Sequence, residues 1–322
     1  MKDVLVFSLT ANVEMTKEIC GYLGVEPGKI EVAHFADGET MVEPQESVRG
    51  KRVFVVQSTC KPVNEHLMEL LVCIDAMKRA SAAEINVVVP YYGYARQDRK
   101  TRARQPITSK LVADLLTAAG IDRIVTVDLH ATQIQGFFDI PTDNLSAISL
   151  FGHHIRENIP NYKDAVVISP DHGGTTRARD LSLRISNTSP IAIVDKRRPM
   201  ANHVEVNNII GDVEGKTCIM VDDICDTGGS LIAGAGLLKE HGAKEIYVYI
   251  THAIFSNNAL EKLQNSCIDK IVVTNTIPLP EEELKKYPKV EVLSLGYHLA
   301  RIIESIADGT PLSNVFDIYD ED

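Results

Sequence analysis

Apolar strand-forming segments and helical segments alternate along almost the whole chain of 322 residues. In the first half, the pattern predicts strands at 3–8, 53–57, 85–89 and 124–127, and helices at 12–23, 64–80 and 106–119. In the second half, it predicts strands at 166–169, 191–194 and 219–221, and helices at 231–241 and 295–307. Short apolar runs of this kind suit strands that are buried on both faces. The alternation therefore predicts an α/β fold with mostly parallel, doubly wound sheets.

Two short stretches recur at a separation of roughly 160 residues, which is longer than any solenoid repeat. Val48–Lys51 resembles Val213–Lys216, and each is followed by a predicted strand. Lys78–Ile85 resembles Lys239–Ile246 at a similar separation. We therefore predict that one α/β domain has been duplicated. The predicted domains are residues 1–146 and residues 147–322, the terminal helix of the second being free to pack back on the first.

Composition and charge argue against several classes of protein. The net charge of -11 speaks against general nucleic-acid binding, which needs a broad basic surface. The six cysteines form no CxxC pair, which speaks against a zinc site and suits a reduced protein of the cytoplasm. The apolar run at 4–7 is too short for a signal peptide, and no segment approaches transmembrane length. We expect a cytoplasmic protein with neither nucleic acid nor membrane as partner.

The stretch Cys218–Ser230, which reads CIMVDDICDTGGS, carries a strong chemical signal. Its apolar strand delivers Asp222 and Asp223, which can accept hydrogen bonds from sugar hydroxyls or hold Mg²⁺. The Gly-rich turn that follows exposes backbone N–H groups and the positive end of a helix dipole, which suits a phosphate. The predicted phosphate loop consists of Asp226, Thr227, Gly228, Gly229 and Ser230. A tight turn with an Asp cap is the alternative, but the preceding Asp pair favours a site for a phosphorylated sugar.

Two more polar residues follow predicted strands, where open α/β sheets place their ligands. His130 comes after the strand at 124–127, and a neutral imidazole there can bind a divalent metal or donate to a phosphate. Asp171 comes after the strand at 166–169 and precedes two glycines. Each has a structural alternative, because a lone histidine is often a structural residue and an aspartate before glycines often caps a turn.

Two basic clusters stand out against the acidic background. The first cluster consists of Arg96, Arg99, Lys100, Arg102 and Arg104, and the second of Lys196, Arg197 and Arg198. Solvated surface loops are the alternative for both. The first cluster follows tyrosines at a strand end, which favours contact with a polyanion.

Several runs together resemble the ribose-phosphate diphosphokinases, a family with the type I phosphoribosyltransferase-like fold. The matching runs are FADGE (35–39), YARQDRK (94–100), DLHATQIQGFFD (128–139), PDHGG (170–174), KRRP (196–199) and DDICDTGGS (222–230). The resemblance covers essentially the whole chain, and Thr142 is one departure from the family's usual aliphatic residue. It implies an enzyme that transfers the β,γ-diphosphoryl group of MgATP to ribose 5-phosphate. The products would be AMP and phosphoribosyl diphosphate (PRPP), for nucleotide biosynthesis.

The resemblance also implies a role for each matching residue. ATP would contact Phe35, Asp37, Glu39, Arg96 and Gln97, of which the first three would come from a neighbouring subunit. Mg²⁺ would bind His130 and Asp171, with waters and phosphate oxygens completing its octahedron. Ribose 5-phosphate would bind Asp222, Asp223 and the loop 226–230. Lys196 and Arg198 would stabilise charge on the transferring phosphoryl group. For Phe35, a place in the core is the alternative.

Regulation and assembly are also implied by the resemblance. Members of the common class form hexamers that ADP inhibits at a site also used by phosphate, so we expect a homo-oligomer, in this case a hexamer. The positions that match this regulatory site are Ser47, Arg49, Ser81 and Arg104. Pro311 stands where a phosphate-binding serine is expected, and proline has neither a hydroxyl nor an N–H. Weakened or altered inhibition by ADP is the expected consequence.

Two other functions compete with this interpretation. A phosphoribosyltransferase would consume PRPP, and it predicts a single domain without the ATP motifs. A non-catalytic regulatory subunit of the same family should have lost the metal histidine or the basic loop. The chain keeps His130, Asp171, Lys196 and Arg198, which disfavours that second alternative.

Overall fold

The computed structural model describes residues 3–197 and 206–316, and its chain divides into two compact units. Unit 1 comprises Met1–Ser146, Asn275–Pro278 and Ser294–Phe316. Unit 2 comprises Ala147–Thr274 and Leu279–Leu293 within the described residues. Among the helices described, none combines the length and the apolar character needed to cross a membrane.

Unit 1 is built on a five-stranded sheet of order β1-β4-β5-β6-β7, in which all neighbouring pairs are parallel. Its strands are β1 (Val4–Ser8), β4 (Arg52–Val56), β5 (Glu84–Val89), β6 (Arg123–Val127) and β7 (Thr142–Leu145). A separate antiparallel hairpin is formed by β2 (Ile30–His34) and β3 (Thr40–Pro44). The helices are η1 (Thr10–Asn12), α1 (Val13–Leu23), α2 (Val63–Arg79), α3 (Thr108–Ala119), η2 (Thr132–Phe137), α9 (Gly296–Asp308) and α10 (Ser313–Phe316).

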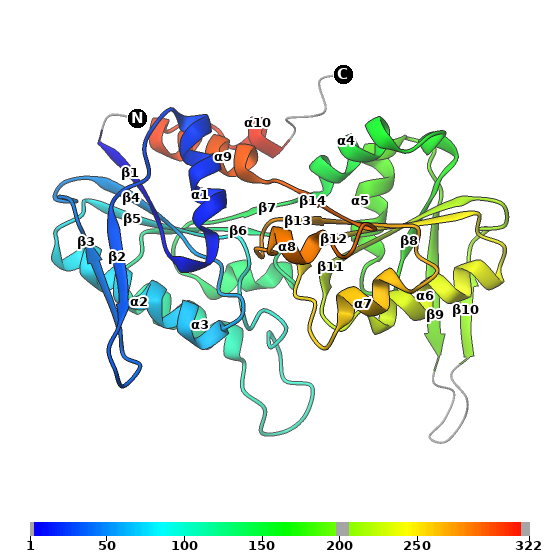
Figure 1. The fold of residues 1–322 in the computed structure, drawn as a ribbon, viewed down its shortest axis with the longest axis horizontal. Helices are drawn as coiled ribbons and strands as arrows, with labels where there is room; N and C mark the ends of the chain where they lie inside the picture. Colours follow the sequence, from blue (N-terminus) through cyan, green and yellow to red (C-terminus); the bar gives the residue numbers. More distant parts are fainter. Residues whose placement is uncertain (1–2, 198–205, 317–322) are drawn as a thin grey trace. The chain divides into compact units, whose positions relative to one another are not determined.

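Alternating side chains of the central strands build the core of unit 1. Val53 and Val55 of β4 join one cluster with Leu70 and Ile74 of α2. Phe54, which lies between the two valines, is also fully buried. Figure 1 shows α2 and α3 on one face of this sheet and α1 and α9 on the other. Burial on both faces explains why β4 reads as an unbroken apolar run in the sequence.

Unit 2 is built on a seven-stranded sheet of order β10-β9-β8-β11-β12-β13-β14. Only the β9–β10 pair is antiparallel among its neighbours. The strands are β8 (Val166–Ser169), β9 (Ile191–Arg197), β10 (Val206–Ile210), β11 (Thr217–Cys225), β12 (Glu245–Ala253), β13 (Lys270–Thr274) and β14 (Val290–Leu293). The helices are α4 (Ile148–Asn158), η3 (Tyr162–Asp164), α5 (Thr175–Ile185), α6 (Gly229–Glu240), α7 (Ala259–Gln264) and α8 (Glu281–Leu284).

The central strand β11 divides its side chains between two apolar clusters. Cys218 and Met220 pack in the cluster that contains residues of α6 and α7. Ile219 and Val221 pack in the cluster that contains residues of α4 and α5. Figure 1 shows these two pairs of helices on opposite faces of the sheet of unit 2. The strand that carries the predicted sugar site is therefore held rigidly from both sides.

The turns that precede β4 and β11 have the same local geometry. Gly50 and Gly215 both have φ near +69°, a left-handed conformation that glycine adopts without steric cost. The N–H of Gly50 donates to the carbonyl oxygen of Ser81 at 2.9 Å, and that of Gly215 donates to the carbonyl oxygen of Gly242 at 2.8 Å. The recurrence seen in the sequence is thus matched by equal backbone contacts, which supports duplication.

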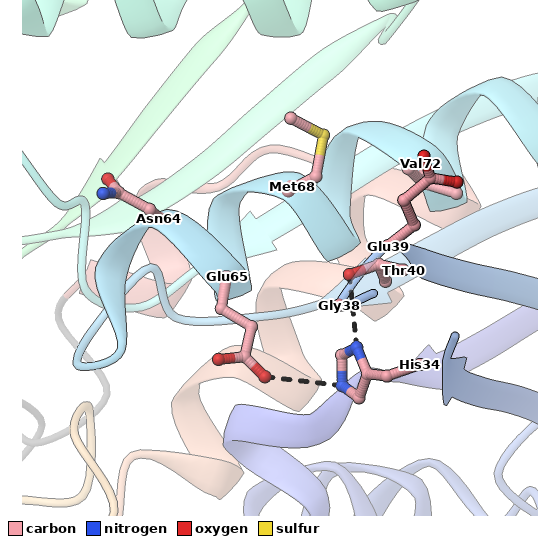
Figure 2. Close-up of a pocket in the computed structure, with 8 residues that line it drawn as sticks. All are labelled: His34, Gly38, Glu39, Thr40, Asn64, Glu65, Met68 and Val72. Carbon is pink, nitrogen blue, oxygen red and sulfur yellow. Dashed lines mark hydrogen bonds and ion pairs between the residues drawn. The ribbon is translucent and has the colours of Figure 1, made fainter. Parts of the chain in front are cut away.

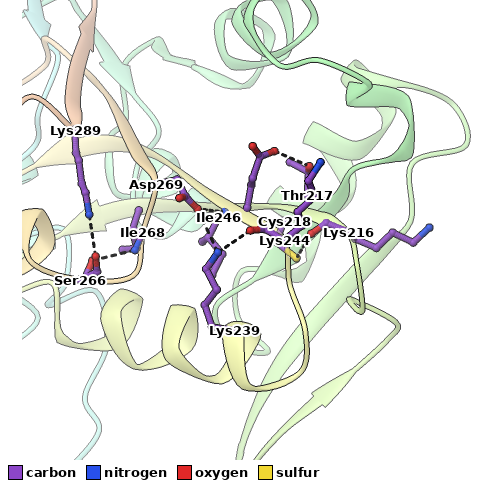
Figure 3. A network of polar contacts seen from close by, with 11 residues as sticks. Lys216, Thr217, Cys218, Lys239, Lys244, Ile246, Ser266, Ile268, Asp269 and Lys289 are labelled. Atoms are coloured by element: carbon purple, nitrogen blue, oxygen red, sulfur yellow. Dashed lines mark hydrogen bonds and ion pairs between the residues drawn. The ribbon is translucent and has the colours of Figure 1, made fainter.

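A second shared contact fixes the start of the following strand in each unit. The carboxylate of Asp122 accepts the N–H of Ile85 at 2.8 Å, and the carboxylate of Asp269 accepts the N–H of Ile246 at 2.7 Å. Figure 3 shows that Lys239 of α6 also reaches Asp269, with 3.5 Å between the ammonium nitrogen and a carboxylate oxygen. These contacts anchor the carboxyl end of α6, so that its amino end is fixed at the predicted phosphate loop.

The predicted α/β fold class is confirmed, and the elements foreseen from the sequence lie within a few residues of their predicted bounds. The terminal helix α9 belongs to unit 1, where it packs against α1, as the domain prediction allowed. Two details differ. Strand β11 continues past Val221 to Cys225, because its pairing with β12 continues. Lys196 and Arg197 lie in β9 rather than in a loop, because β10 extends that strand by antiparallel pairing.

Candidate active site

Two adjacent carboxylates near the end of β11 form the centre of the site in unit 2. Asp223 is buried and Asp222 is half-buried. Arg177, in the first turn of α5, places Nη1 at 3.1 Å from Oδ1 of each carboxylate. A single guanidinium therefore bridges the pair. Sequence reasoning missed Arg177, although its helix follows β8 and β8 is the strand that pairs with β11.

The pKa of Asp222 is far above the ordinary range of an aspartate. Burial and the negative charge of Asp223 raise the pKa of Asp222 to about 7, while the positive charge of Arg177 acts in the opposite direction. Asp222 therefore changes its protonation state near neutral pH. In the ionised state, it is a strong acceptor for a hydroxyl group.

The loop 226–230 turns the chain from β11 into α6. Gly228 has φ of +74°, and a Cβ added there would lie 3.2 Å from Cγ of Leu263, so the backbone requires glycine. Thr227 and Ser230 are exposed. Gly229 begins α6, a helix of 12 residues. Its first N–H groups have no partner within the helix, so the loop can receive an anion.

The segment after β8 carries the predicted metal ligand Asp171. Its side chain is exposed, and Oδ1 accepts the N–H of Gly174 at 3.0 Å. The turn-capping alternative is therefore realised, and the carboxylate still has acceptor capacity for a hard cation. The neighbouring His172 places Nε2 at 2.8 Å from Oδ1 of Asp195. This contact between the PDHGG segment and β9 was not foreseen from the sequence.

In unit 1, one polar contact joins the segment after His130 to the segment that carries the first basic cluster. His130 is exposed directly after β6. Three residues later, Gln133 donates from Nε2 to Oδ2 of Asp98 at 2.8 Å. Gln97 accepts a hydrogen bond from the hydroxyl of Thr108 at 2.5 Å, which ties the same segment to the start of α3. Arg96 is exposed beside it, so these residues form one polar surface at the carboxyl ends of β5 and β6.

The predicted adenine segment forms the tip of the β2–β3 hairpin. Phe35 is 56% exposed, which excludes its alternative place in the core. The N–H of Glu39 donates to the carboxylate of Asp37 at 3.1 Å, so Asp37 also stabilises the turn. The hydroxyl of Tyr94, in the YARQDRK run, donates to Oδ1 of Asn64, which lines the same pocket as Glu39 of the hairpin tip.

The other predicted residues are placed as follows. Ser47 and Arg49 are exposed, and the hydrogen bond from Gly50 to the carbonyl of Ser81 puts their segment beside Ser81. Arg104 and Pro311 are exposed on separate segments. The backbone of Lys196 pairs with Asn207 of β10, and Arg198 lies outside the described residues.

Comparison with known proteins decides the family. Residues 4–120 match the model of the N-terminal domain of ribose phosphate pyrophosphokinase, and residues 169–317 match the phosphoribosyl synthetase-associated domain. The chain is 51% identical to the ribose-phosphate pyrophosphokinase of Bacillus subtilis over 315 residues, which is 98% of each chain. It is 52% identical to that of Bacillus caldolyticus over 312 residues, which is 97% of each. The chain belongs to the ribose-phosphate pyrophosphokinase family.

A solved structure agrees with this assignment. The crystal structure of phosphoribosylpyrophosphate synthetase from Mycobacterium smegmatis is 41% identical and matches with a TM-score of 0.89. The match covers 95% of this chain and 99% of that chain. The predicted family and the prediction of a diphosphokinase enzyme, a transferase, are thereby confirmed. The phosphoribosyltransferase alternative is wrong, because the relatives that match over the full length are pyrophosphokinases.

Proposed function

We propose that the chain transfers the β,γ-diphosphoryl group of ATP to the 1-hydroxyl of ribose 5-phosphate, with the sugar phosphate bound in unit 2. One observation carries this proposal: Asp222 and Asp223, bridged by Arg177, stand directly before the loop that opens α6. The carboxylates can accept hydrogen bonds from hydroxyl groups, and a few residues further on, the N–H groups at the start of α6 can donate to a phosphate. A phosphorylated sugar presents the complementary groups in the same order.

The loop binds the 5-phosphate in this proposal. Backbone N–H groups at the start of α6 and the exposed hydroxyls of Thr227 and Ser230 donate to its oxygens. Asp222 and Asp223 accept hydrogen bonds from the ribose hydroxyls. Arg177 holds both carboxylates in place, so that the sugar meets acceptors whose positions are already set. Such preorganisation reduces the free-energy cost of orienting the substrate.

Nucleotide binding is proposed for the exposed surface that carries Arg96 and Gln97. The adenine of ATP bound to a neighbouring subunit would contact Phe35, Asp37 and Glu39. The exposed ring of Phe35 suits a stacking contact with the base. His130 and Asp171 are proposed ligands of Mg²⁺. Their exposed imidazole and carboxylate fit a cation that keeps several waters and phosphate oxygens. When bound, Mg²⁺ would neutralise charge on the phosphates.

Lys196 and Arg198 are the proposed catalytic cations. Charge builds on the transferring phosphoryl group as AMP leaves, and cations placed there stabilise it. The attacking 1-hydroxyl approaches the β-phosphorus in line, so no covalent enzyme intermediate is required. The contribution of the chain is therefore positioning and charge stabilisation.

Assembly, location and regulation are proposed on the same basis. We propose a homo-oligomer, a hexamer, that works in the cytoplasm. Supporting this, Phe35 is an exposed aromatic residue at a hairpin tip, where a neighbouring subunit can use it. A regulatory site for phosphate or ADP is proposed at Ser47, Arg49, Ser81 and Arg104. Pro311 removes a donor from that site, so we propose that inhibition by ADP is weakened.

Phosphorus NMR tests the reaction directly. Ribose 5-phosphate, MgATP and phosphate are mixed with the full chain, with the variant Lys196→Ala and with the control Lys286→Ala, an exposed residue of unit 2. We expect PRPP and AMP to appear together, to nearly vanish in Lys196→Ala and to persist in the control. If neither product forms while both substrates still bind, the chain is instead a regulatory subunit.

A titration with ADP at saturating substrates tests the regulatory proposal. Shallow inhibition that more substrate reverses is expected. Strong, cooperative inhibition would contradict the role given to Pro311. Light scattering, which measures the molar mass of the assembly in solution, tests whether the chain forms a hexamer.

A further inference from the structure

Three potential metal ligands to which the proposed reaction gives no role meet in unit 1, beside the proposed adenine-binding tip. His34 of β2 and Glu65 and Glu69 of α2 bring a ring nitrogen and two carboxylate oxygens within 4.8 Å of one another. Glu65 and Glu69 are one helical turn apart and therefore share a face of α2. Figure 2 shows His34 and Glu65 pointing toward each other from the hairpin and the helix. The cluster thus joins two elements that are separate in the sheet topology.

The ring of His34 is held in a manner suited to a metal ligand. Nε2 lies 3.4 Å from Oε1 of Glu65, and Nδ1 lies 3.4 Å from the hydroxyl oxygen of Thr40. With the proton on Nδ1, His34 donates to Thr40 and directs the lone pair of Nε2 toward the two glutamates. Metal-binding histidines are commonly oriented by such a hydrogen bond from the other ring nitrogen.

Glu69 supplies the second argument, because its charge is buried. The residue is 1% exposed. Its carboxylate accepts hydrogen bonds from the hydroxyl of Thr10 at 2.6 and 2.8 Å and from the amide of Gln57 at 2.8 Å. Both donors are neutral, and within the described residues no lysine or arginine pairs with Glu69. These hydrogen bonds offset part of the cost of burying the carboxylate, and none of them brings a positive charge, so a cation at this cluster would add a favourable interaction.

The cluster is also accessible from solvent. A pocket of about 650 Å³ lies beside it, lined in part by His34, Thr40, Asn64, Glu65 and Met68. Waters in this pocket can complete the coordination of a bound ion. The side chains of His34 and Glu65 are 41% and 48% exposed. They are therefore free to move the short distance that brings their ligand atoms into contact with a bound ion.

We propose that His34, Glu65 and Glu69 bind one divalent first-row transition-metal ion. One imidazole nitrogen and two carboxylate oxygens suit ions such as Zn²⁺ better than Mg²⁺, which prefers oxygen ligands alone. The cysteine pattern has no bearing on this site, because it contains no thiolate.

A bound ion would fasten the hairpin to α2. His34 directly precedes the tip 35–39, and Thr40 directly follows it. The ion therefore restrains both ends of the tip. This consequence rests on the proposed role of Phe35, Asp37 and Glu39 in binding adenine. With the tip restrained, less conformational entropy is lost when the nucleotide binds, so the KM for ATP falls.

Zinc binding to the full chain tests the site without any substrate. The protein is stripped with a chelator, excess Mg²⁺ is added, and Zn²⁺ affinity is measured by competition with a chromophoric chelator. We expect the chain to bind one Zn²⁺ ion tightly. The variants His34→Gln and Glu65→Gln should lower the Zn²⁺ affinity about 100-fold or more, and Thr40→Val about 10-fold. The exposed residues give matched controls: His241→Gln and Glu14→Gln should keep full affinity. Circular dichroism and thermal melting verify that each variant folds.

His130→Ala separates this site from the proposed Mg²⁺ ligands. The tight equivalent of Zn²⁺ should persist in that variant. The proposal is overturned if His34→Gln and Glu65→Gln bind Zn²⁺ as tightly as the controls, or if His130→Ala abolishes binding. In a separate assay, one equivalent of Zn²⁺ should lower the KM for ATP about threefold in the parent chain and leave His34→Gln unchanged. An equal KM with and without Zn²⁺ would remove the link to the hairpin and leave the reaction itself unaffected.

Discussion

The β4–α2 connection of unit 1 and the β11–α6 connection of unit 2 occupy the same place in their sheets, yet only the second has the features of a site. Counted from the shared turn before each strand, Gln57 and Ser58 stand where Asp222 and Asp223 stand in unit 2. The scaffold is therefore similar, and the difference lies in the polar side chains at these two positions.

In unit 1, these polar groups are used up by the fold. Gln57 is fully buried, and its amide nitrogen donates to Glu69 at 2.8 Å. The hydroxyl of Ser58 donates to the carbonyl of Thr276 at 2.6 Å and accepts the N–H of Tyr91 at 3.1 Å. The side chains of Gln57 and Ser58 therefore serve contacts within unit 1.

In unit 2, the corresponding positions carry charged side chains. Two carboxylates share the guanidinium of Arg177, and burial together with the negative charge of Asp223 raises the pKa of Asp222 to about 7. The hydroxyls of Thr227 and Ser230 remain exposed. Of these two similar connections, one thus has neutral side chains that serve the fold, and the other presents groups that a sugar phosphate can satisfy.

The largest effect is expected from neutralising the charged pair. The double variant Asp222→Asn and Asp223→Asn makes unit 2 resemble unit 1, and we expect kcat/KM for ribose 5-phosphate to fall about 1000-fold. Each lost charge-assisted hydrogen bond is worth about 1.5–3 kcal/mol. Steady-state kinetics at saturating MgATP measures the change, and ATP binding should remain. A loss of less than threefold would mean that these carboxylates do not hold the sugar.

The next effect is expected from the loop backbone. Gly228→Ala places a Cβ at φ of +74° and 3.2 Å from Leu263, so the loop must shift. We expect about a 100-fold loss of ribose 5-phosphate affinity, measured by isothermal titration. Gly236→Ala, within the helix α6 that follows the loop, meets no atom within 4 Å and is the control. It should stabilise the helix by about 0.5–1 kcal/mol. Equal affinities in both variants would contradict the phosphate role of the loop.

A smaller effect is expected from Arg177→Gln, about 10-fold in kcat/KM. The positive charge of Arg177 lowers the pKa of Asp222, so removing it raises that pKa further. In the parent chain, the affinity for ribose 5-phosphate should decline as pH falls through about 7, because Asp222 becomes protonated. In Arg177→Gln, this decline should begin at higher pH. In Arg177→Lys, which keeps the positive charge, the pH at which the decline begins should return part of the way to that of the parent chain. A pH profile of KM identical in parent and variant would show that Arg177 acts only in folding.

The smallest effect on activity is expected in unit 1. Ser58→Ala removes a buried hydroxyl that accepts the N–H of Tyr91 and donates to the carbonyl of Thr276, so the free energy of unfolding should fall by about 1–3 kcal/mol, measured with urea. Activity under folding conditions should stay within twofold. Thr227→Ala, at an exposed position of unit 2, should show the reverse, with unchanged stability and weaker ribose 5-phosphate binding. The comparison fails if Ser58→Ala impairs sugar binding as Thr227→Ala does.

Much of the fold could be read from local patterns. The apolar runs of β4 and β8 predict buried strands, and the Gly-rich turn after β11 predicts the start of α6. Strand β10 could not be found this way, because Val206–Ile210 reads VNNII and its apolar signal is weak. Its pairing with β9 placed Lys196 in a strand, although its basic neighbours indicated a loop. Strands pair with residues that can be far away in the sequence, so a short stretch of sequence carries little information about which strands pair.

The sequence by itself determined the α/β alternation and the family, and it predicted the duplication and the sugar-phosphate chemistry of the 222–230 segment, because each depends on residues that are close along the chain. Only the tertiary structure decided that Arg177 meets Asp222 and Asp223, and that Ser58 is turned inward. It also decided that His34 lies beside the glutamates of α2. These contacts depend on which strands and helices become neighbours, and a folded sheet makes neighbours of residues that are far apart in the sequence.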